Sequence, residues 1–239
     1  MNPIVYQVFY YLSAAIAILF VFVPHEFAHA YSAYRNGDLT AKYYGRLTLN
    51  PVKHFDLMGF LLCVLAGFGW AKPVPINPNN FRKYKKGLFE TAVAGVCTNY
   101  VIAFIVYPIF LVVARYIPES STALIYVKGF LELVLYRIYI ISLSIIAFNL
   151  LPFFPLDGFR IIESCTSPFN KFRLFLEKYG RYILLGLIIE CFICNILVQA
   201  TGVTALQYLN VLGFYLQWFA QNILGAPIWG FWDWIFTLF

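Results

Sequence analysis

The chain has 239 residues, of which 62% are hydrophobic and only 12% are charged. A soluble domain is about half apolar and about a quarter charged, so this excess of apolar side chains cannot be buried in one water-soluble core. The composition therefore excludes a soluble globular protein and predicts a polytopic membrane protein. The net charge of +6 does not indicate a nucleic-acid partner, because the basic residues cluster in two connections between apolar stretches.

The first apolar stretch, residues 4–34, is long enough for a membrane-spanning helix at about 1.5 Å per residue. Near its end lies an H-E-x-x-H sequence that begins at His25 and ends at His29. Residues four apart lie on one face of a helix, so both imidazoles can reach one metal ion. The pattern therefore predicts a zinc site in which Glu26 activates the bound water.

The connection after this helix is predicted to contain β structure. Residues 42–49 alternate between two sides with a period of two, which predicts a strand that ends at Asn50-Pro51. We expect a small membrane-associated β-hairpin here. Residues 57–71 then form a short apolar run near the lower limit for spanning a membrane, and a proline-rich loop with five basic residues and no acidic one follows at 72–86.

The rest of the chain is predicted to be helical. Two further clear spans are followed by a short helix and two more apolar stretches, at residues 88–114, 125–151, 158–166, 179–200 and about 203–224. An aromatic tail then contains Trp229, Trp232 and Trp234, which are typical of the membrane interface.

A second motif, N-L-L-P-F-F-P-L-D-G, runs from Asn149 to Gly158. Its two prolines break a helix where the chain would still be at membrane depth. Unsatisfied backbone at that depth is tolerated only beside a cavity or a site. Asp157 is therefore the natural third zinc ligand, and it leaves the fourth position for water.

The two motifs together resemble those of the site-2 protease family of intramembrane zinc metalloproteases. The segment from Gly95 to Asn99 looks like that family's G-x-x-x-N element, and G-R-L-T-L-N-P followed by G-W-A-K-P-V-P looks like its compact members, which lack an appended regulatory domain. The resemblance covers about residues 20–165. Val96 and Phe159 stand where the family commonly has proline and glycine, and these departures affect local backbone without removing a ligand.

The resemblance implies that the two motif histidines and Asp157 bind one zinc ion per chain, so the helix ends that carry them must lie on the same side of the membrane. Between them the chain must cross the membrane an even number of times, and residues 88–114 and 125–151 supply two crossings. Residues 57–71 are therefore expected to form a re-entrant or interfacial segment. Basic loops flank that run, so the positive-inside rule places the active-site end on the cytoplasmic side.

Two amides complete the expected site. The resemblance suggests that Asn149 and Asn99 bind the substrate backbone or the developing oxyanion, which makes Asn149 a catalytic as well as a substrate-binding candidate. Helix–helix hydrogen bonding is the alternative for each amide. His54 lies beside Lys53 in a loop and is not expected to bind zinc.

The predicted function is that of an intramembrane zinc endopeptidase that cuts membrane-anchored substrates within or near their transmembrane helices, as in regulated intramembrane proteolysis. Such a substrate must unwind before cleavage, and the strand at 42–49 could hold it by edge pairing. The alternative is a catalytically silent membrane scaffold or chaperone that retains the site-2 protease fold. A transporter would need paired inverted repeats, which the sequence does not show.

The predicted fold is an all-α transmembrane helix bundle with a small β-hairpin and a re-entrant segment. It forms a single membrane-embedded domain over residues 1–239, with a catalytic core at about 4–166 and C-terminal helices at about 179–239. We expect a multi-pass protein of the plasma membrane whose partners are the lipid bilayer and a transmembrane protein or peptide substrate. The sequence leaves the substrate's identity and the oligomeric state open.

Overall fold

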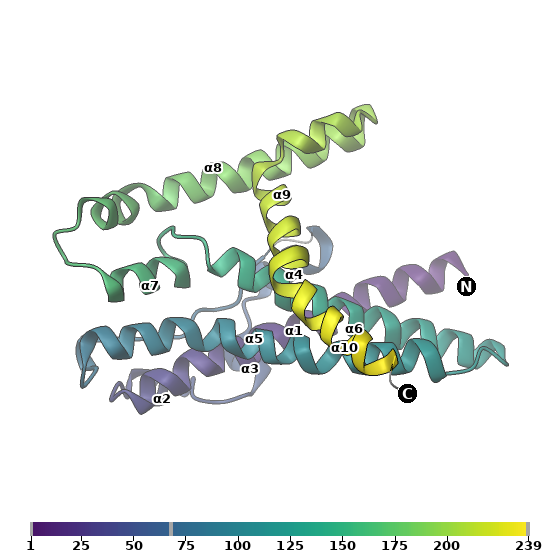
Figure 1. Ribbon diagram of the computed structural model, residues 1–239, viewed down its shortest axis with the longest axis horizontal. Helices are drawn as coiled ribbons and strands as arrows, with labels where there is room; N and C mark the ends of the chain where they lie inside the picture. The colour runs from purple at the N-terminus through teal and green to yellow at the C-terminus, as the bar shows by residue number, and fades with distance from the viewer. Residues whose placement is uncertain (1, 67–68, 238–239) are drawn as a thin grey trace.

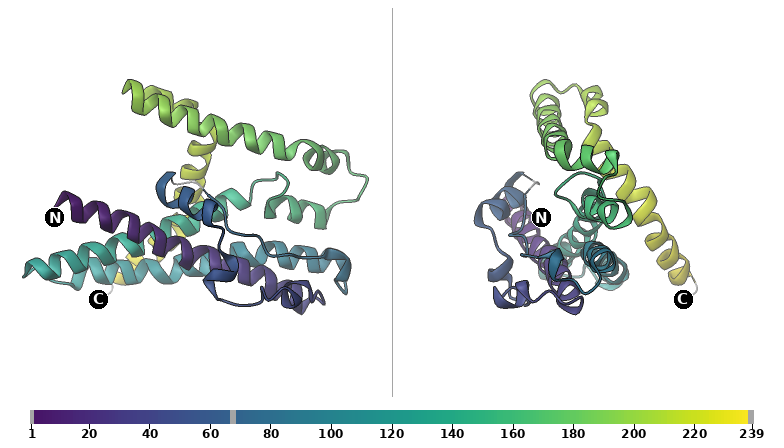
Figure 2. Two further views of the ribbon diagram at one scale, coloured as in Figure 1. Left: turned by 180° about the vertical axis from the view of Figure 1, so that it is seen from behind. Right: turned by 90° about the vertical axis from the view of Figure 1, so that its left-hand side faces the viewer.

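Three long helices form the centre of the protein. The computed structural model describes residues 2–66 and 69–237, and it places α1 (Pro3–Arg35), α5 (Tyr84–Tyr116) and α6 (Thr122–Asn149) side by side along its long axis (Figure 1). A fourth long helix, α8 (Lys171–Thr201), lies apart from these three when the molecule is seen end-on (Figure 2, right). The expected helical bundle is therefore confirmed.

These four helices are long and apolar enough to cross a membrane. Large apolar side chains remain exposed on each of them, for example Phe20, Ile105, Val127 and Leu185. Each such side chain would lose about 1.5–3 kcal/mol of stabilisation in water relative to full burial, and lipid removes this cost. The protein is therefore an integral membrane protein.

The segment between α1 and α5 contains only short helices, and the strand predicted at residues 42–49 is wrong. Within the described part of the chain there is no strand, and the predicted β-hairpin is replaced by one turn of helix, α2 (Thr40–Tyr43). Gly45 has a φ of +63°, and the Arg46 N–H donates to the Ala41 carbonyl at 2.8 Å. The chain therefore folds back on itself within six residues and leaves no extended edge.

The short apolar run forms a helix that is too short to span a bilayer. This helix, α4 (Leu57–Ala66), has ten residues and follows the single turn of α3 (Pro51–His54). Ten residues of α-helix are about 15 Å long, half the hydrocarbon thickness of about 30 Å. The re-entrant or interfacial position expected for residues 57–71 stays a prediction, and residues 67 and 68 lie outside the described part of the chain.

The proline-rich loop is tied to the end of α1 through Asp38, whose side chain is fully buried. Its carboxylate accepts hydrogen bonds from the Asn77 N–H at 2.7 Å, the Asn80 side-chain amide at 2.8 Å and the Thr40 N–H at 3.1 Å. A short helical turn, η1 (Pro78–Asn80), follows Asn77. The loop is therefore an ordered part of the fold that lies against α1.

The C-terminal third packs on the central helices in a way that the sequence did not predict. The apolar stretch at about 203–224 does not form one continuous α-helix: a 3-10 helix, η2 (Thr204–Leu209), comes first, and α9 (Val211–Trp218) then continues through a π-helix, η3 (Phe219–Gly225), into α10 (Ala226–Thr237). The Asn210 side chain starts α9 by accepting from the Gly213 N–H at 2.7 Å. The aromatic tail is therefore helical, and the Trp232 indole N–H donates to the Phe104 carbonyl at 3.0 Å.

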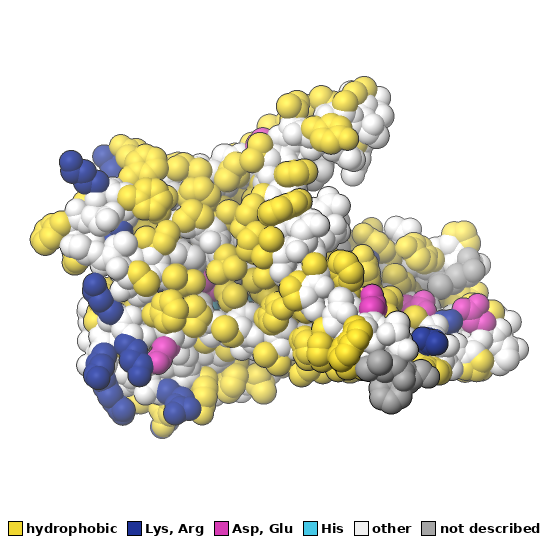
Figure 3. All heavy atoms as spheres, viewed as in Figure 1, with side chains coloured by type: hydrophobic (Ala, Val, Ile, Leu, Met, Phe, Trp, Pro, Cys, Tyr) yellow, Lys and Arg dark blue, Asp and Glu magenta, His cyan; other side chains and the backbone are white. Residues whose placement is uncertain are grey.

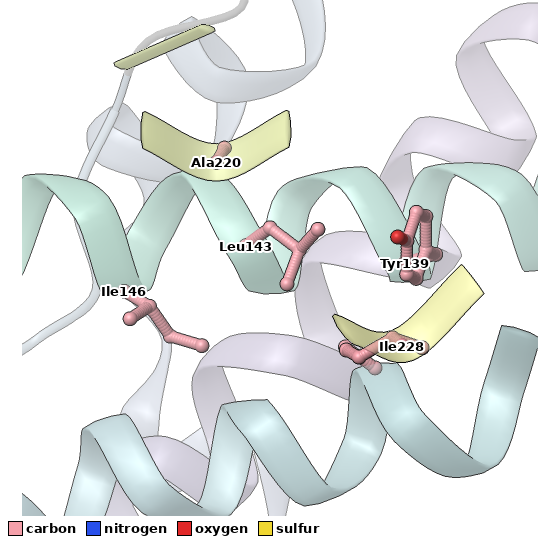
Figure 4. Packing of buried hydrophobic residues seen from close by; sticks show 6 residues of the cluster. Tyr139, Leu143, Ile146, Ala220 and Ile228 are labelled. Atoms are coloured by element: carbon pink, nitrogen blue, oxygen red, sulfur yellow. The ribbon is translucent and has the colours of Figure 1, made fainter. Parts of the chain in front are cut away.

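Apolar side chains join this C-terminal part to α6. Tyr139, Leu143 and Ile146 are spaced four and three residues apart and form one stripe on α6. Ala220 of η3 and Ile228 of α10 pack against that stripe (Figure 4). One hydrophobic core cluster thus lies between the central helices and the last helices of the chain, and another joins α1 and α6.

The short helix α7 (Asp157–Cys165) is held by a buried carboxylate. Glu163 accepts from Arg173 of α8 at 2.8 Å, from Arg160 at 3.1 Å and from the hydroxyl of Tyr84 on α5 at 3.2 Å. Further along α8, a Cβ added at Gly180 would lie 2.8 Å from the Phe154 backbone nitrogen. Helix α8 therefore packs closely against the segment that leads into α7.

We predict that Asp38→Asn destabilises the protein by about 1–3 kcal/mol, because a buried set of donors loses its charged acceptor. Denaturant unfolding in detergent micelles would measure this change. Burial raises the pKa of Asp38, but the hydrogen bonds from Thr40, Asn80 and Asn77 outweigh it and hold that pKa below its ordinary value. The stabilisation is therefore present at neutral pH and is lost as the pH falls below about 4.

The matched control is Glu119→Gln, which removes an exposed ion pair with Lys128. It should change the free energy of unfolding far less than Asp38→Asn does, because exposed ion pairs contribute little. Equal stability of the two variants would contradict a structural role for Asp38.

Candidate metal centre

The structure brings together the three residues that the sequence analysis selected as zinc ligands. His25 and His29 are buried on α1, and their Nε2 atoms lie 3.0 Å apart. Asp157, the first residue of α7, places its Oδ2 atom 3.2 Å from Nε2 of His29 and 3.6 Å from Nε2 of His25. Among the described residues this is the one group of three or more potential ligands that is close enough to share a metal ion.

The chemistry of these atoms fits a cation. Nδ1 of His29 lies 2.7 Å from the Thr91 carbonyl oxygen, which can only accept, so Nδ1 carries the proton and the lone pair of the neutral ring is on Nε2. Oδ2 of Asp157 is buried and has no hydrogen-bond partner. Ligand atoms of a tetrahedral zinc ion lie about 3.3 Å apart. The three measured separations therefore match what zinc needs.

Asn99 supports the other histidine. It is fully buried on α5, and its Nδ2 atom lies 3.1 Å from Nδ1 of His25, while its Oδ1 atom has no partner. A histidine that binds metal through Nε2 has its proton on Nδ1 and needs an acceptor there. Turning the amide by half a rotation places Oδ1 at this nitrogen, so that Oδ1 accepts from the ring N–H. This contact favours a role for Asn99 in holding His25 over the expected role in substrate binding.

Gly95 allows α5 to approach the two histidines. A Cβ at this position would lie 2.6 Å from Cε1 of His25 and still closer to Nε2 of His29. Any larger residue would push into the metal-binding atoms. The G-x-x-x-N spacing therefore has a direct physical explanation: it places the glycine and Asn99 on the same face of α5, one against the rings and the other against a ring nitrogen.

Asp157 reaches the site through a tight turn at the end of α6. The Leu156 N–H donates to the Phe153 carbonyl at 2.9 Å, which closes this turn. A Cβ on Gly158 would collide with the backbone carbonyls of Leu150 and Leu151. The L-D-G sequence therefore packs the start of α7 directly onto the last turn of α6, and this packing aims the carboxylate of Asp157 at α1.

Glu26 lies on α1 between the two histidines and is held by a contact that the sequence analysis missed. Its Oε2 atom accepts a hydrogen bond from the Val74 N–H at 3.0 Å. The type of a residue does not reveal where its backbone N–H points, so the K-P-V-P sequence alone does not predict this contact.

The remaining two polar candidates make hydrogen bonds to nearby backbone carbonyls. The side-chain amide of Asn149 donates to the Ile145 carbonyl, one turn back on α6, at 3.0 Å, and its expected role in catalysis and substrate binding stays a prediction. Nε2 of His54 lies 2.7 Å from the Thr48 carbonyl oxygen, and this histidine is not part of the group that could hold a metal.

Comparison with known proteins agrees with this geometry. Residues 13–189 match the family described as Peptidase family M50. The chain belongs to this family. Its relatives include "Putative zinc metalloprotease YwhC" of Bacillus subtilis (strain 168), which is 40% identical over 176 residues, or 73% of this chain and 78% of that protein. No solved structure matches the chain. The assignment of this M50 peptidase to the site-2 proteases is thereby confirmed.

We predict that Gly95→Ala removes most of the bound zinc, because the new methyl group would occupy the space of the histidine rings. Metal analysis of the purified protein would measure zinc per chain. Gly186→Ala on α8 is the matched control, since a Cβ there meets nothing within 4 Å. It should leave the zinc content unchanged.

We also predict that Asp157→Ala lowers the zinc content as strongly as His25→Ala does, since each change removes one of three ligands. Glu177→Gln, which changes an exposed acid on α8, should have no effect. A wild-type protein without zinc, or zinc that is indifferent to Asp157, would contradict the ligand set.

Proposed function

We propose that this M50 peptidase is an intramembrane zinc endopeptidase that hydrolyses peptide bonds within or near the transmembrane helices of membrane-anchored substrates. The observation that carries the proposal is the convergence of His25, His29 and Asp157 between apolar helices that are long enough to span a bilayer. Zinc held there, one ion per chain, would polarise the scissile carbonyl and make a water molecule more acidic.

Glu26 is the proposed general base. It follows His25 directly in the chain, and its charge interacts with His29. One of its oxygens is held by the Val74 N–H, which leaves the other to accept a proton and to deliver it to the leaving amine. In their neutral forms His29 and His25 present the Nε2 lone pair to a metal, because Thr91 and Asn99 lie at their Nδ1 atoms.

The proposed substrate is a transmembrane protein or peptide. The carbonyl groups of a membrane helix are locked in hydrogen bonds, so the substrate must unwind before it can be cut. We expect helix-breaking residues close to the cleaved bond. The segment at 42–49 cannot hold an unwound substrate by strand pairing, because it forms no strand.

The distribution of charge supports an active site near the cytoplasmic side of the plasma membrane. Lysine and arginine side chains gather at the end of the molecule where α2 lies and α5 begins (Figure 3). His29 is six residues before Arg35, or about 9 Å along α1. The positive-inside rule places this basic end in the cytoplasm, so the proposed chemistry occurs at a shallow depth.

We predict that Glu26→Gln lowers cleavage by at least about 100-fold, because it removes the proton acceptor and keeps the shape of the side chain. The assay would follow cleavage of single-span reporter helices that contain helix-breaking residues, in liposomes. Zinc content should be unchanged. A chelator should abolish wild-type cleavage, and added zinc should restore it.

Cleavage by the Glu26→Gln variant at the wild-type rate would exclude Glu26 as the base. If neither protein cleaves any reporter while both bind zinc and bind the reporter helices, the alternative of a silent scaffold that retains the fold would be favoured.

A further inference from the structure

The segment that contacts Glu26 has an unusual supply of backbone donors. Prolines 73 and 75 flank Val74, and proline has no N–H group. Val74 therefore offers the single N–H in this part of the loop, and that N–H donates to Oε2 of Glu26 at 3.0 Å. Residues that precede proline are also restricted to extended conformations, so the direction of this N–H is fixed by the sequence.

Both ends of the segment are anchored. At Lys72 the N–H donates to the His54 carbonyl at 3.0 Å, and the Lys72 carbonyl accepts from Nη2 of Arg46 at 2.6 Å. At the other end the Asn77 N–H donates to the buried carboxylate of Asp38 at 2.7 Å. The backbone between these two anchors therefore has little freedom to move away from Glu26.

The side chains agree with a fixed position. Val74 is 9% exposed and packs with Ala30 of α1 and Ala41 of α2. Arg46 is buried as well, and its positive charge interacts with Glu26. Burying a charged side chain costs free energy of folding unless the charge is well paired. The burial of Arg46 therefore indicates that its position beside the loop matters.

We propose that residues 72–77, here named the brace, hold the carboxylate of Glu26 in its working orientation. The Val74 N–H fixes one oxygen, and Arg46 and Asp38 are positioning residues that act through the brace. The inference rests on the proposed function of Glu26 and explains two motifs that zinc binding leaves unused, G-R-L-T-L-N-P and G-W-A-K-P-V-P. Their contact at Arg46 and Lys72 is what anchors the brace.

The test is Val74→Pro, which removes the N–H between two existing prolines. A hydrogen bond to a charged group is lost, so kcat should fall by roughly 10- to 100-fold. KM and zinc content should not change, because the brace provides no ligand to the metal. A merely structural defect would lower zinc content and raise KM together with the fall in kcat.

A second variant at the same position separates the N–H from the side chain. Val74→Ala shortens the packed side chain but retains the N–H, and it should lose much less kcat than Val74→Pro.

Equal kcat for Val74→Pro and Val74→Ala, while Glu26→Gln is inactive, would overturn the brace and leave the proposed function intact. A wild-type protein that cleaves nothing would overturn the proposed function itself. If Val74→Pro loses zinc, two variants of Arg46 test the brace in its place. Arg46→Gln should lower kcat at constant zinc content, and Arg46→Lys should recover most of the lost kcat. Equal kcat for these two variants would also overturn the brace.

Discussion

The close approach of α5 to α1 at Gly95 is the constraint on which the site depends. Thr91, Gly95 and Asn99 are spaced four residues apart and form one stripe on α5. The two helices run in opposite directions, so the stripe meets the histidines in order: Thr91 reaches His29 and Asn99 reaches His25. Because the middle position has no side chain, both ring nitrogens come within hydrogen-bond distance.

The third ligand arrives from a distant part of the chain by a simple route. Helices α5 and α6 carry the chain away from the histidines and back again (Figure 1), and both are candidate membrane spans. The turn after Asn149 then places Asp157 beside α1. Two antiparallel candidate spans therefore separate the first two ligands from the third, which is why the third ligand returns to the first two.

Much of the site could be predicted because it depends on side chains at fixed helical spacings. His25 and His29 are four residues apart, so they lie on one face of a helix. The prolines before Asp157 break a helix at membrane depth, where the broken backbone is expected to lie beside a site. The brace could not be predicted in the same way, since its contact with Glu26 uses a backbone N–H whose position depends on tertiary anchors such as Asp38.

The errors in the predicted fold arose where short patterns compete with local turns. An alternation over eight residues favoured a strand at 42–49, but the side chain of Asp38 accepts from the Thr40 N–H and starts a helical turn instead. The apolar run at 203–224 gave no sign of where its helix begins, because Gly202 and Asn210 set the boundaries locally.

The packing of α8 at Gly180 determines how short a working version of this protein can be. A chain cut after α7 would contain every proposed ligand, yet Glu163 would lose Arg173, and the backbone at Phe153 and Phe154 would lose the helix that covers it. That backbone is the base of the turn that aims Asp157. A shortened chain that keeps these contacts must therefore retain α8 at least as far as Gly180, well past the last residue that would contact zinc.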